Sequence, residues 1–207
     1  MKNYGFKASE INGTEHLLEL PASLDLPLEY SYEDVLPEVI DQGEDSICVA
    51  CSVSSYLNWR ENLKDGEACD IDIDLFEIYH SKTTAGDGMT YKDAFHFLRH
   101  HGVSSKNGVL KIREYVRPQN VLEMKYAILA NGPCFGALPV FNDKKYFWKK
   151  ESPRQRVSGY HAIALVGYTE NGFIIRNSWG RSFGENGYPF LDMEDFGKLL
   201  EVWSIVD

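Results

Sequence analysis

The chain changes character near its middle, and this change constrains the fold more than any other feature. From Ser46 to about Asn62 there is neither glycine nor proline, and apolar residues recur at helical spacing. Similar patterns predict helices over residues 90–101 and 120–131. The later apolar runs are short and are separated by Gly, Asn and Pro, which favours strands over residues 135–140, 162–168, 173–176 and 202–206. Helices followed by strands indicate an α+β protein whose two lobes meet at a cleft.

Composition and charge narrow the class of protein. The 207 residues are 43% apolar, which is enough for one ordinary hydrophobic core. No segment approaches the roughly 18 apolar residues that a membrane span needs, and a net charge of −10 disfavours general binding to nucleic acid. The four cysteines form no repeating disulfide framework, and the N-terminus lacks the apolar stretch of a secretory signal. We therefore expect a cytoplasmic protein without membrane or nucleic-acid partners.

Cys48 is the first candidate for chemistry. It falls in the first turn of a predicted helix, where the positive end of the helix dipole favours thiolate over thiol. Gln42 lies six residues upstream on a predicted loop, and its carboxamide could donate a hydrogen bond to an oxyanion beside the helix start. A cysteine considered alone is more often a small buried apolar residue. The case for a nucleophile therefore depends on a base elsewhere in the chain.

His161 is the best candidate for this base, because it alone of the six histidines opens an apolar strand. Asn177 follows later in the sequence Asn-Ser-Trp-Gly. Its amide side chain can orient the imidazole, and the indole of Trp179 can shield that hydrogen bond from water, as in a Cys-His-Asn triad. Each piece alone is a weak signal, but together they predict nucleophilic catalysis by a thiol.

In this order the motifs resemble those of the papain-like cysteine peptidases. The family's glutamine six residues before the nucleophile falls on Gln42 and Cys48, and the residues from Cys48 read Cys-Val-Ala-Cys-Ser, close to the family pattern. The family's His-Ala, apolar strand and Val-Gly-Tyr begin at His161. The block Asn-Ser-Trp-Gly, followed by Phe-Gly-Glu-Asn-Gly-Tyr over residues 183–188, is the most specific match. The resemblance runs from about Leu24 to the C-terminus.

The resemblance implies a papain-like two-lobed α+β fold in one catalytic domain over residues 1–207. We expect an extended segment over 1–39, a mainly helical lobe over 40–117, and an antiparallel, barrel-like β lobe over 118–207. The active site would lie in a cleft between the lobes that is open to water. Such a protein would hydrolyse peptide bonds of a polypeptide substrate without a cofactor or metal, and its oligomeric state stays open.

The resemblance also assigns roles to single residues. Cys48 would be the nucleophile, His161 the general base and later acid, Asn177 the residue that orients the imidazole, and Gln42 an oxyanion donor. A thiolate and an imidazolium attract each other, and the helix dipole favours the thiolate, so this pair would already be charged near neutral pH.

The expected substrate-binding residues rest on the resemblance alone. Gly86 and Gly88 are candidates for the glycines along which a substrate backbone runs, although a plain turn explains them equally well. Cys134 and Tyr160 fall where the family builds an apolar pocket for the second residue before the cut, and Trp179 completes the candidate set. The sequence contains no recognisable helical inhibitory propeptide, so control of the activity is expected to come from elsewhere.

Two other functions stay open. Residues 45–47, Asp-Ser-Ile, depart from the family pattern before the nucleophile, so a papain-fold binding or structural protein with weak or no activity is one alternative. Cys48 and Cys51 have the CxxC spacing of a thiol oxidoreductase, which is the other. That spacing does not explain the glutamine, histidine and asparagine of the motifs.

Three further patterns receive structural interpretations. Residues 141–150 mix lysines with aromatic residues and indicate a basic surface hairpin. His96 and His100 lie one turn apart on a predicted helix, which fits a solvated helix face better than a zinc site. The alternating acidic run over residues 70–74 lacks the glycine and the terminal glutamate of a calcium loop, and indicates a strand edge or a helix entry.

Overall fold

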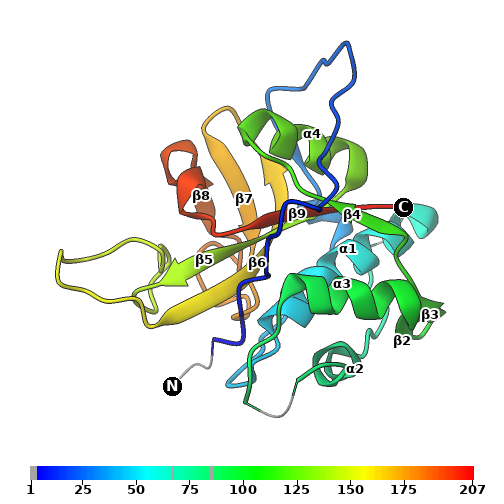
Figure 1. Ribbon diagram of the computed structural model, residues 1–207, viewed down its shortest axis with the longest axis horizontal. Coiled ribbons are helices and arrows are strands. Elements are labelled where there is room, and N and C mark those ends of the chain that lie inside the picture. The colour runs from blue at the N-terminus through cyan, green and yellow to red at the C-terminus, as the bar shows by residue number, and fades with distance from the viewer. Residues whose placement is uncertain (1–3, 67, 84–85) are drawn as a thin grey trace.

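The structure, a computed structural model, describes residues 4–66, 68–83 and 86–207. Helices α1 to α3 lie together on one side of the molecule, and the long strands lie on the other side (Figure 1). The N-terminal segment runs along the boundary between the two groups (Figure 1). This arrangement is the α+β class that the sequence predicts.

The three longer helices form where the sequence predicts them. They are α1 (Cys48–Asp65), α3 (Tyr91–His100) and α4 (Val121–Asn131). The side chains of Thr90 and Asn120 cap α3 and α4, each accepting a hydrogen bond from a backbone N–H of the first turn. Such caps satisfy N–H groups that a helix start leaves without a partner.

Several short elements were not predicted. Strands of two or three residues carry too little periodicity to be recognised in a sequence. The acidic run at 70–74 leads into a short helix, which Asp74 caps, so the interpretation as a helix entry is confirmed. The short elements that were not predicted are the strands β1 (Tyr30–Ser31), β2 (Val103–Ser105), β3 (Gly108–Leu110), β4 (Glu114–Val116) and β8 (Phe190–Asp192), the α-helix α2 (Leu75–His80), and the 3-10 helices η1 (Glu33–Val35) and η2 (Met193–Lys198).

One antiparallel sheet has the strand order β4-β9-β5-β6-β7-β8, and β1 adds to it along β6. Its longer strands are β5 (Cys134–Val140), β6 (Gly159–Tyr168), β7 (Gly172–Arg176) and β9 (Val202–Val206), as predicted. Among the described residues β4 and β8 do not pair with each other, so the sheet does not close into a barrel. The ten-residue β6 runs through the middle of the sheet and carries His161, opposite Leu138 of β5.

The two groups of elements join where α1 packs across β6. The hydroxyl of Tyr91 lies buried at this joint, 3.1 Å from Ser52 Oγ of α1 and 3.1 Å from the carbonyl oxygen of Ile163 on β6. Ser52 lies about one turn after the start of α1, and Ile163 lies shortly after the histidine on β6. Tyr91 therefore connects the segments that carry the two most important candidate residues.

Residues 141–150 differ from the predicted surface hairpin. They form bends and turns, and Phe147 and Trp148 are buried. The indole N–H of Trp148 donates to Asp195 at 2.8 Å, and the ammonium group of Lys149 pairs with the same carboxylate at 3.1 Å. Phe147 and Trp148 thus belong to the core of the β lobe, because burial of their apolar surface stabilises the fold.

Candidate active site

Cys48 is the first residue of α1, and this helix begins without a side-chain cap. The residue before it, Ile47, has no side-chain oxygen, so the N–H groups of the first turn and the helix dipole act near the thiol. Cys48 is nevertheless 0% exposed. Burial raises the pKa of its thiol to about 11, although backbone hydrogen bonds from Ala162 and Gly5 act in the opposite direction. The thiolate expected near neutral pH is therefore not favoured in this arrangement, because desolvation outweighs the hydrogen bonds.

His161 and Asn177 form a hydrogen-bonded pair, as the sequence predicts. His161 Nε2 lies 2.7 Å from Asn177 Oδ1. The backbone N–H of Ser178 donates to the same Oδ1 at 2.8 Å, which identifies this atom as the oxygen. An amide oxygen only accepts hydrogen bonds, so Nε2 carries a proton and Nδ1 is the ring nitrogen that can act as a base.

Two aromatic side chains enclose this pair. The ring of Trp179 stacks on His161 at a centroid distance of 4.5 Å, with an angle of 29° between the planes. Phe147 meets the same imidazole edge-on at 5.5 Å. His161 and Asn177 are both buried, so the hydrogen bond between them is kept from water and is stronger than it would be in solvent. The sequence predicted the role of Trp179, but it placed Phe147 on a surface hairpin.

Gln42 is brought to the same place by backbone pairing between residues 40–42 and 178–180. Its side-chain oxygen accepts a hydrogen bond from Ser178 Oγ at 2.6 Å. Its Nε2 donates to the carbonyl oxygen of Asp45 at 2.6 Å. A primary amide has two N–H groups, so one bond to Asp45 fixes the carboxamide and leaves it capable of a second donation.

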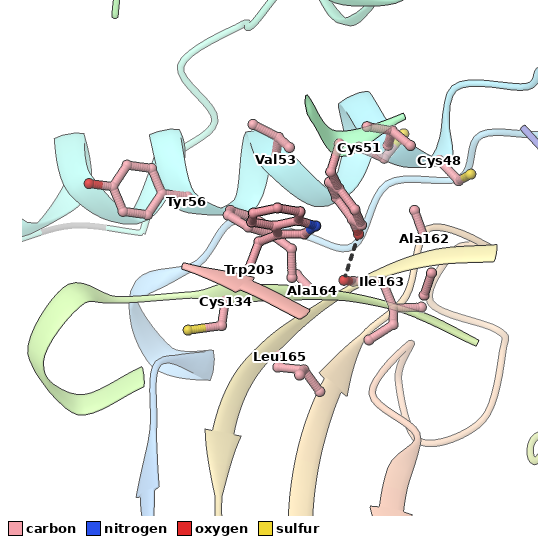
Figure 2. Close-up of a cluster of buried hydrophobic side chains, with 14 of the residues drawn as sticks. Cys48, Cys51, Val53, Tyr56, Cys134, Ala162, Ile163, Ala164, Leu165 and Trp203 are labelled. Carbon is pink, nitrogen blue, oxygen red and sulfur yellow. Dashed lines mark hydrogen bonds between the residues drawn. The ribbon is translucent and has the colours of Figure 1, made fainter. Parts of the chain in front are cut away.

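The thiol and the imidazole come from opposite sides of the joint between α1 and β6. The sulfur of Cys48 accepts a backbone hydrogen bond from Ala162, the residue that follows His161. Figure 2 shows Cys48 at one end of the helix with Ala162 on the strand beneath it. The structure thus brings Cys48 to the residue that follows His161, and it pairs His161 with Asn177, although Cys48 is far from both in the sequence.

Residues 4–7 also lie at this joint, and we call them the cleft segment. A Cβ atom added at Gly5 would lie 1.9 Å from the carbonyl oxygen of Ser46, just before α1. On the other side, the ring of Tyr4 lies 6.3 Å from that of Trp179. The expectation of a cleft open to water is therefore wrong at this point, because the chain's own N-terminal residues fill it. No motif in the sequence marks the cleft segment.

The predicted substrate-binding residues have different environments. Gly88 faces the cleft segment, since a Cβ added there would meet the carbonyl group of Gly5 at 3.2 Å. Gly86 has a φ of 84° and open space around it, which fits a turn. Tyr160 is 38% exposed beside His161.

Cys134 does not lie with the other candidate site residues. It is fully buried on β5, its thiol lies 3.6 Å from the carbonyl oxygen of Gly132, and burial raises its pKa to about 12. Figure 2 shows it at the opposite end of the buried cluster from Cys48. A side chain without exposed surface at that position contributes to the core of the β lobe.

A comparison with protein families settles the relationship of the chain. A model of the family described as "Papain family cysteine protease" matches residues 50–196. The chain belongs to the papain family of cysteine proteases. The matched range includes His161 and Asn177 and begins just after Cys48, so the place of Cys48 in the site rests on its geometry.

Curated relatives from the papain family match this chain over parts of their length. A "Gut-specific cysteine proteinase" of Caenorhabditis elegans is 33% identical over 107 residues, which are 47% of this chain and 29% of that protein. "Cathepsin Q" of Rattus norvegicus is 24% identical in an alignment 229 positions long, which covers 89% of this chain and 66% of that protein. The chain thus spans no more than 66% of either relative.

Solved structures of papain-family proteins show the same fold. The structure of Xylellain, a cysteine protease from Xylella fastidiosa, superposes with a TM-score of 0.82 at 20% identity and covers 99% of this chain and 96% of its own. That of proCathepsin B S9 from Trypanosoma congolense gives 0.80 at 14% identity, with 99% and 86% covered. No helix of the described residues is both long and apolar enough to cross a membrane. Within the same residues, no cluster of three or more His, Cys, Asp or Glu side chains could hold a metal ion.

Proposed function

We propose that this chain is a cysteine peptidase that cleaves peptide bonds of polypeptide substrates with Cys48, His161 and Asn177. The observation that carries the proposal is the buried 2.7 Å hydrogen bond between His161 and Asn177. The residue after His161 is Ala162, whose backbone N–H contacts the Cys48 sulfur. A thiol alone needs no oriented imidazole, whereas a nucleophile that must be deprotonated and later reprotonate a leaving group does.

The chemistry follows from the direction of each hydrogen bond. Nδ1 of His161 takes the proton of the Cys48 thiol, and the thiolate attacks the peptide carbonyl carbon. The resulting oxyanion is stabilised by the backbone N–H of Cys48 and by a second donation from the Gln42 carboxamide. The imidazolium then protonates the departing amine, which leaves an acyl-enzyme. A water molecule, deprotonated by His161, attacks the thioester and releases the new carboxylic acid and the free thiol.

A thiol oxidoreductase has less support. Cys48 and Cys51 are both free thiols, and burial raises the pKa of Cys51 well above that of an ordinary cysteine. A buried resolving thiol of this kind reacts poorly in exchange, because the thiolate is the reactive form. The fixed pair of His161 and Asn177 would have no part in such a reaction.

The test is a peptidase assay on the full chain with a fluorescent protein substrate, combined with alkylation by iodoacetamide and peptide mapping. We expect cleavage that is lost in Cys48→Ala, and alkylation at Cys48 that slows in His161→Ala. The thiol of Cys69, which is only partly buried, provides an internal reference for alkylation that does not depend on the site. Cleavage that survives in Cys48→Ala, or alkylation of Cys48 that is unaffected by His161→Ala, would contradict the proposal.

A further inference from the structure

The buried hydroxyl of Tyr91 has no part in the mechanism above, yet it contacts three other elements at one point. It lies 3.1 Å from Ser52 Oγ on α1, 2.9 Å from the carbonyl oxygen of Gly136 on β5, and 3.1 Å from that of Ile163 on β6. Tyr91 itself is the first residue of α3. One oxygen atom thus connects both lobes, and its bonds fix the groups that it contacts relative to one another.

The direction of these hydrogen bonds follows from the number of protons. Carbonyl oxygens only accept, so the single proton of Tyr91 serves Gly136 and Ile163. The Tyr91 oxygen then accepts from the hydroxyl of Ser52, which also lies 2.9 Å from the carbonyl oxygen of Val49 in its own helix. Burial raises the pKa of the Tyr91 hydroxyl well above its ordinary value, so the proton is present at neutral pH. The bonds therefore run from α1 through Tyr91 to the sheet.

This set of bonds lies close to the two reacting residues. Ser52 lies about one turn after Cys48, on the same face of α1. Ile163 follows shortly after His161 on β6. Figure 2 shows Cys48 at the start of the helix, with Ala162 and Ile163 on the strand below. Any shift of α1 along β6 would therefore change both the Tyr91 bonds and the place of the thiol.

Packing around the ring keeps the Tyr91 hydroxyl at this point. The ring stacks on Phe95 of the same helix at a centroid distance of 5.8 Å, with 18° between the planes. On the sheet side it lies 5.7 Å from the ring of Phe135. All three residues are fully buried, and a close-packed core leaves such rings little freedom to move. The hydroxyl is thus a rigid support for the segments that it connects.

We propose that Tyr91 is a positioning residue of the peptidase, whose hydroxyl fixes the start of α1 against β6 and so sets the separation between the Cys48 sulfur and the His161 ring. The inference rests on the proposed function, because this separation matters for a reaction only if the two groups act together. Tyr91 acts through Ser52 and the carbonyl group of Ile163. A misplacement of reacting groups by about 1 Å can cost about 10²-fold in rate.

The test is Tyr91→Phe in the full chain, with kcat and KM measured on a fluorogenic peptide at a temperature at which every variant is folded. The ring and its packing remain, whereas α1 loses its bond to the sheet. We expect kcat to fall by about 10- to 100-fold. KM should change by less than about twofold, because the variant loses the alignment of the reacting groups and not substrate binding.

The pH profile of kcat/KM provides a second readout. An imidazolium close to the thiolate favours the thiolate, so a larger separation raises the pH at which the thiolate forms. In Tyr91→Phe we expect the midpoint of the acidic limb to rise by about half a pH unit or more. A residue that only stabilised the fold would leave this midpoint unchanged.

Two controls separate positioning from a general loss of stability. Tyr168→Phe makes the same chemical change on β6, at a hydroxyl for which the described residues provide no hydrogen-bond partner. Asn120→Ala removes the side-chain cap of α4 and should lower stability to a similar degree as Tyr91→Phe. Both should retain the wild-type kcat, KM and pH profile. Urea unfolding measures the stability of each variant, and circular dichroism establishes that each keeps the wild-type fold.

Ser52→Ala tests the other end of the bond. In this variant α1 loses its bond to Tyr91, while Tyr91 keeps its bonds to the sheet, and we expect kcat to fall by about three- to tenfold. If both side chains act through one contact, the double variant should be no slower than Tyr91→Phe alone. Losses that multiply in the double variant would contradict the proposed link through α1.

The outcomes separate this proposal from the proposed function. If the wild type cleaves the peptide and Tyr91→Phe retains its kcat within about twofold, the positioning role is overturned and the proposed function stands. An equal fall of kcat in Tyr91→Phe and Asn120→Ala would also overturn the positioning role, since the loss would then follow stability. A wild type that does not cleave, or cleavage that survives in Cys48→Ala, would overturn the proposed function and the positioning role with it.

Discussion

The site has a β wall, formed by the β lobe, and a helical wall, formed by the helical lobe, and the two are built differently. The β wall consists mainly of side chains: His161 is hydrogen-bonded to the amide of Asn177 and enclosed by the rings of Trp179 and Phe147. The helical wall works through backbone groups and small residues, with an uncapped helix start at Cys48 and glycines at the surface. A wall without large side chains can accept another stretch of backbone, and the cleft segment lies there.

This difference predicts where single substitutions act most strongly. On the β wall, His161→Ala removes the base and should lower kcat/KM by about 10²- to 10⁴-fold. Asn177→Ala should cost less, because the imidazole remains and loses only its fixed orientation. Both are measured with a fluorogenic peptide in the Gly5→Ala background, because a methyl group at residue 5 cannot fit against Ser46 and makes Cys48 more accessible. A loss smaller than tenfold in His161→Ala would mean that the β wall is not the source of the base.

On the helical wall, the buried thiol of Cys48 should make the free energy of unfolding depend on pH. The Cys48 thiol has an ordinary pKa of 9.0 and a raised value of about 11 in the folded chain. The unfolded chain therefore loses its thiol proton first, so stability is fully present below pH 9 and falls as the pH rises toward 11. Two pKa units correspond to about 2.7 kcal/mol.

The measurement is urea unfolding between pH 8 and 11, in the wild type and in Cys48→Ala. The alkaline loss of unfolding free energy should be smaller in the variant by about 2 kcal/mol. Parallel curves for the two proteins would show that Cys48 is not desolvated by the cleft segment.

The joint between the walls can be tested with two tyrosines. Tyr91→Phe removes a buried hydroxyl that contacts both α1 and β6, and should lower the unfolding free energy by about 1 to 2 kcal/mol. Tyr168→Phe removes an equally buried hydroxyl for which the described residues provide no hydrogen-bond partner, and should leave stability unchanged or slightly higher. If the two variants have equal denaturation midpoints, Tyr91 does not fix the helix to the strand.

The smallest effect is expected away from both walls. The ammonium group of Lys144 pairs with Glu151 on the surface, where both side chains are largely exposed. Lys144→Ala should change stability by less than about 0.5 kcal/mol and leave kcat/KM unaltered. Thermal melts measure the stability of the variant, and a kinetic assay measures its kcat/KM. A marked loss of activity would show that the basic segment over residues 141–150 takes part in the reaction.

The sequence predicted the β wall and the long elements well. The block around Asn177 and the strand that carries His161 are local patterns, in which neighbouring residues in the chain are also neighbours in the site. The sequence predicted a helix from Ser46 with Cys48 in its first turn, and α1 begins at Cys48. The absence of glycine and proline and the helical spacing of apolar residues indicate such a helix.

The cleft segment and the burial of Phe147 could not be predicted in the same way. Gly5 meets Ser46 across a long separation in sequence, and one glycine near a terminus carries no signal of its own. Phe147 lies among lysines, so its composition indicated a surface, whereas the fold turns its ring toward His161. Contacts of this kind depend on tertiary packing, which local patterns do not encode.

The claim on which the rest depends is that Cys48 and His161 act as a pair, and the pH dependence of Cys48 alkylation tests it most directly. The measurement compares Gly5→Ala with the double variant Gly5→Ala, His161→Ala. With His161 present, we expect the alkylation midpoint to lie below the ordinary cysteine pKa of 9.0. Without His161 the midpoint should rise by at least about one pH unit, with a rate at pH 6 at least about tenfold lower. The same midpoint in both proteins, at or above 9.0, would contradict the pairing.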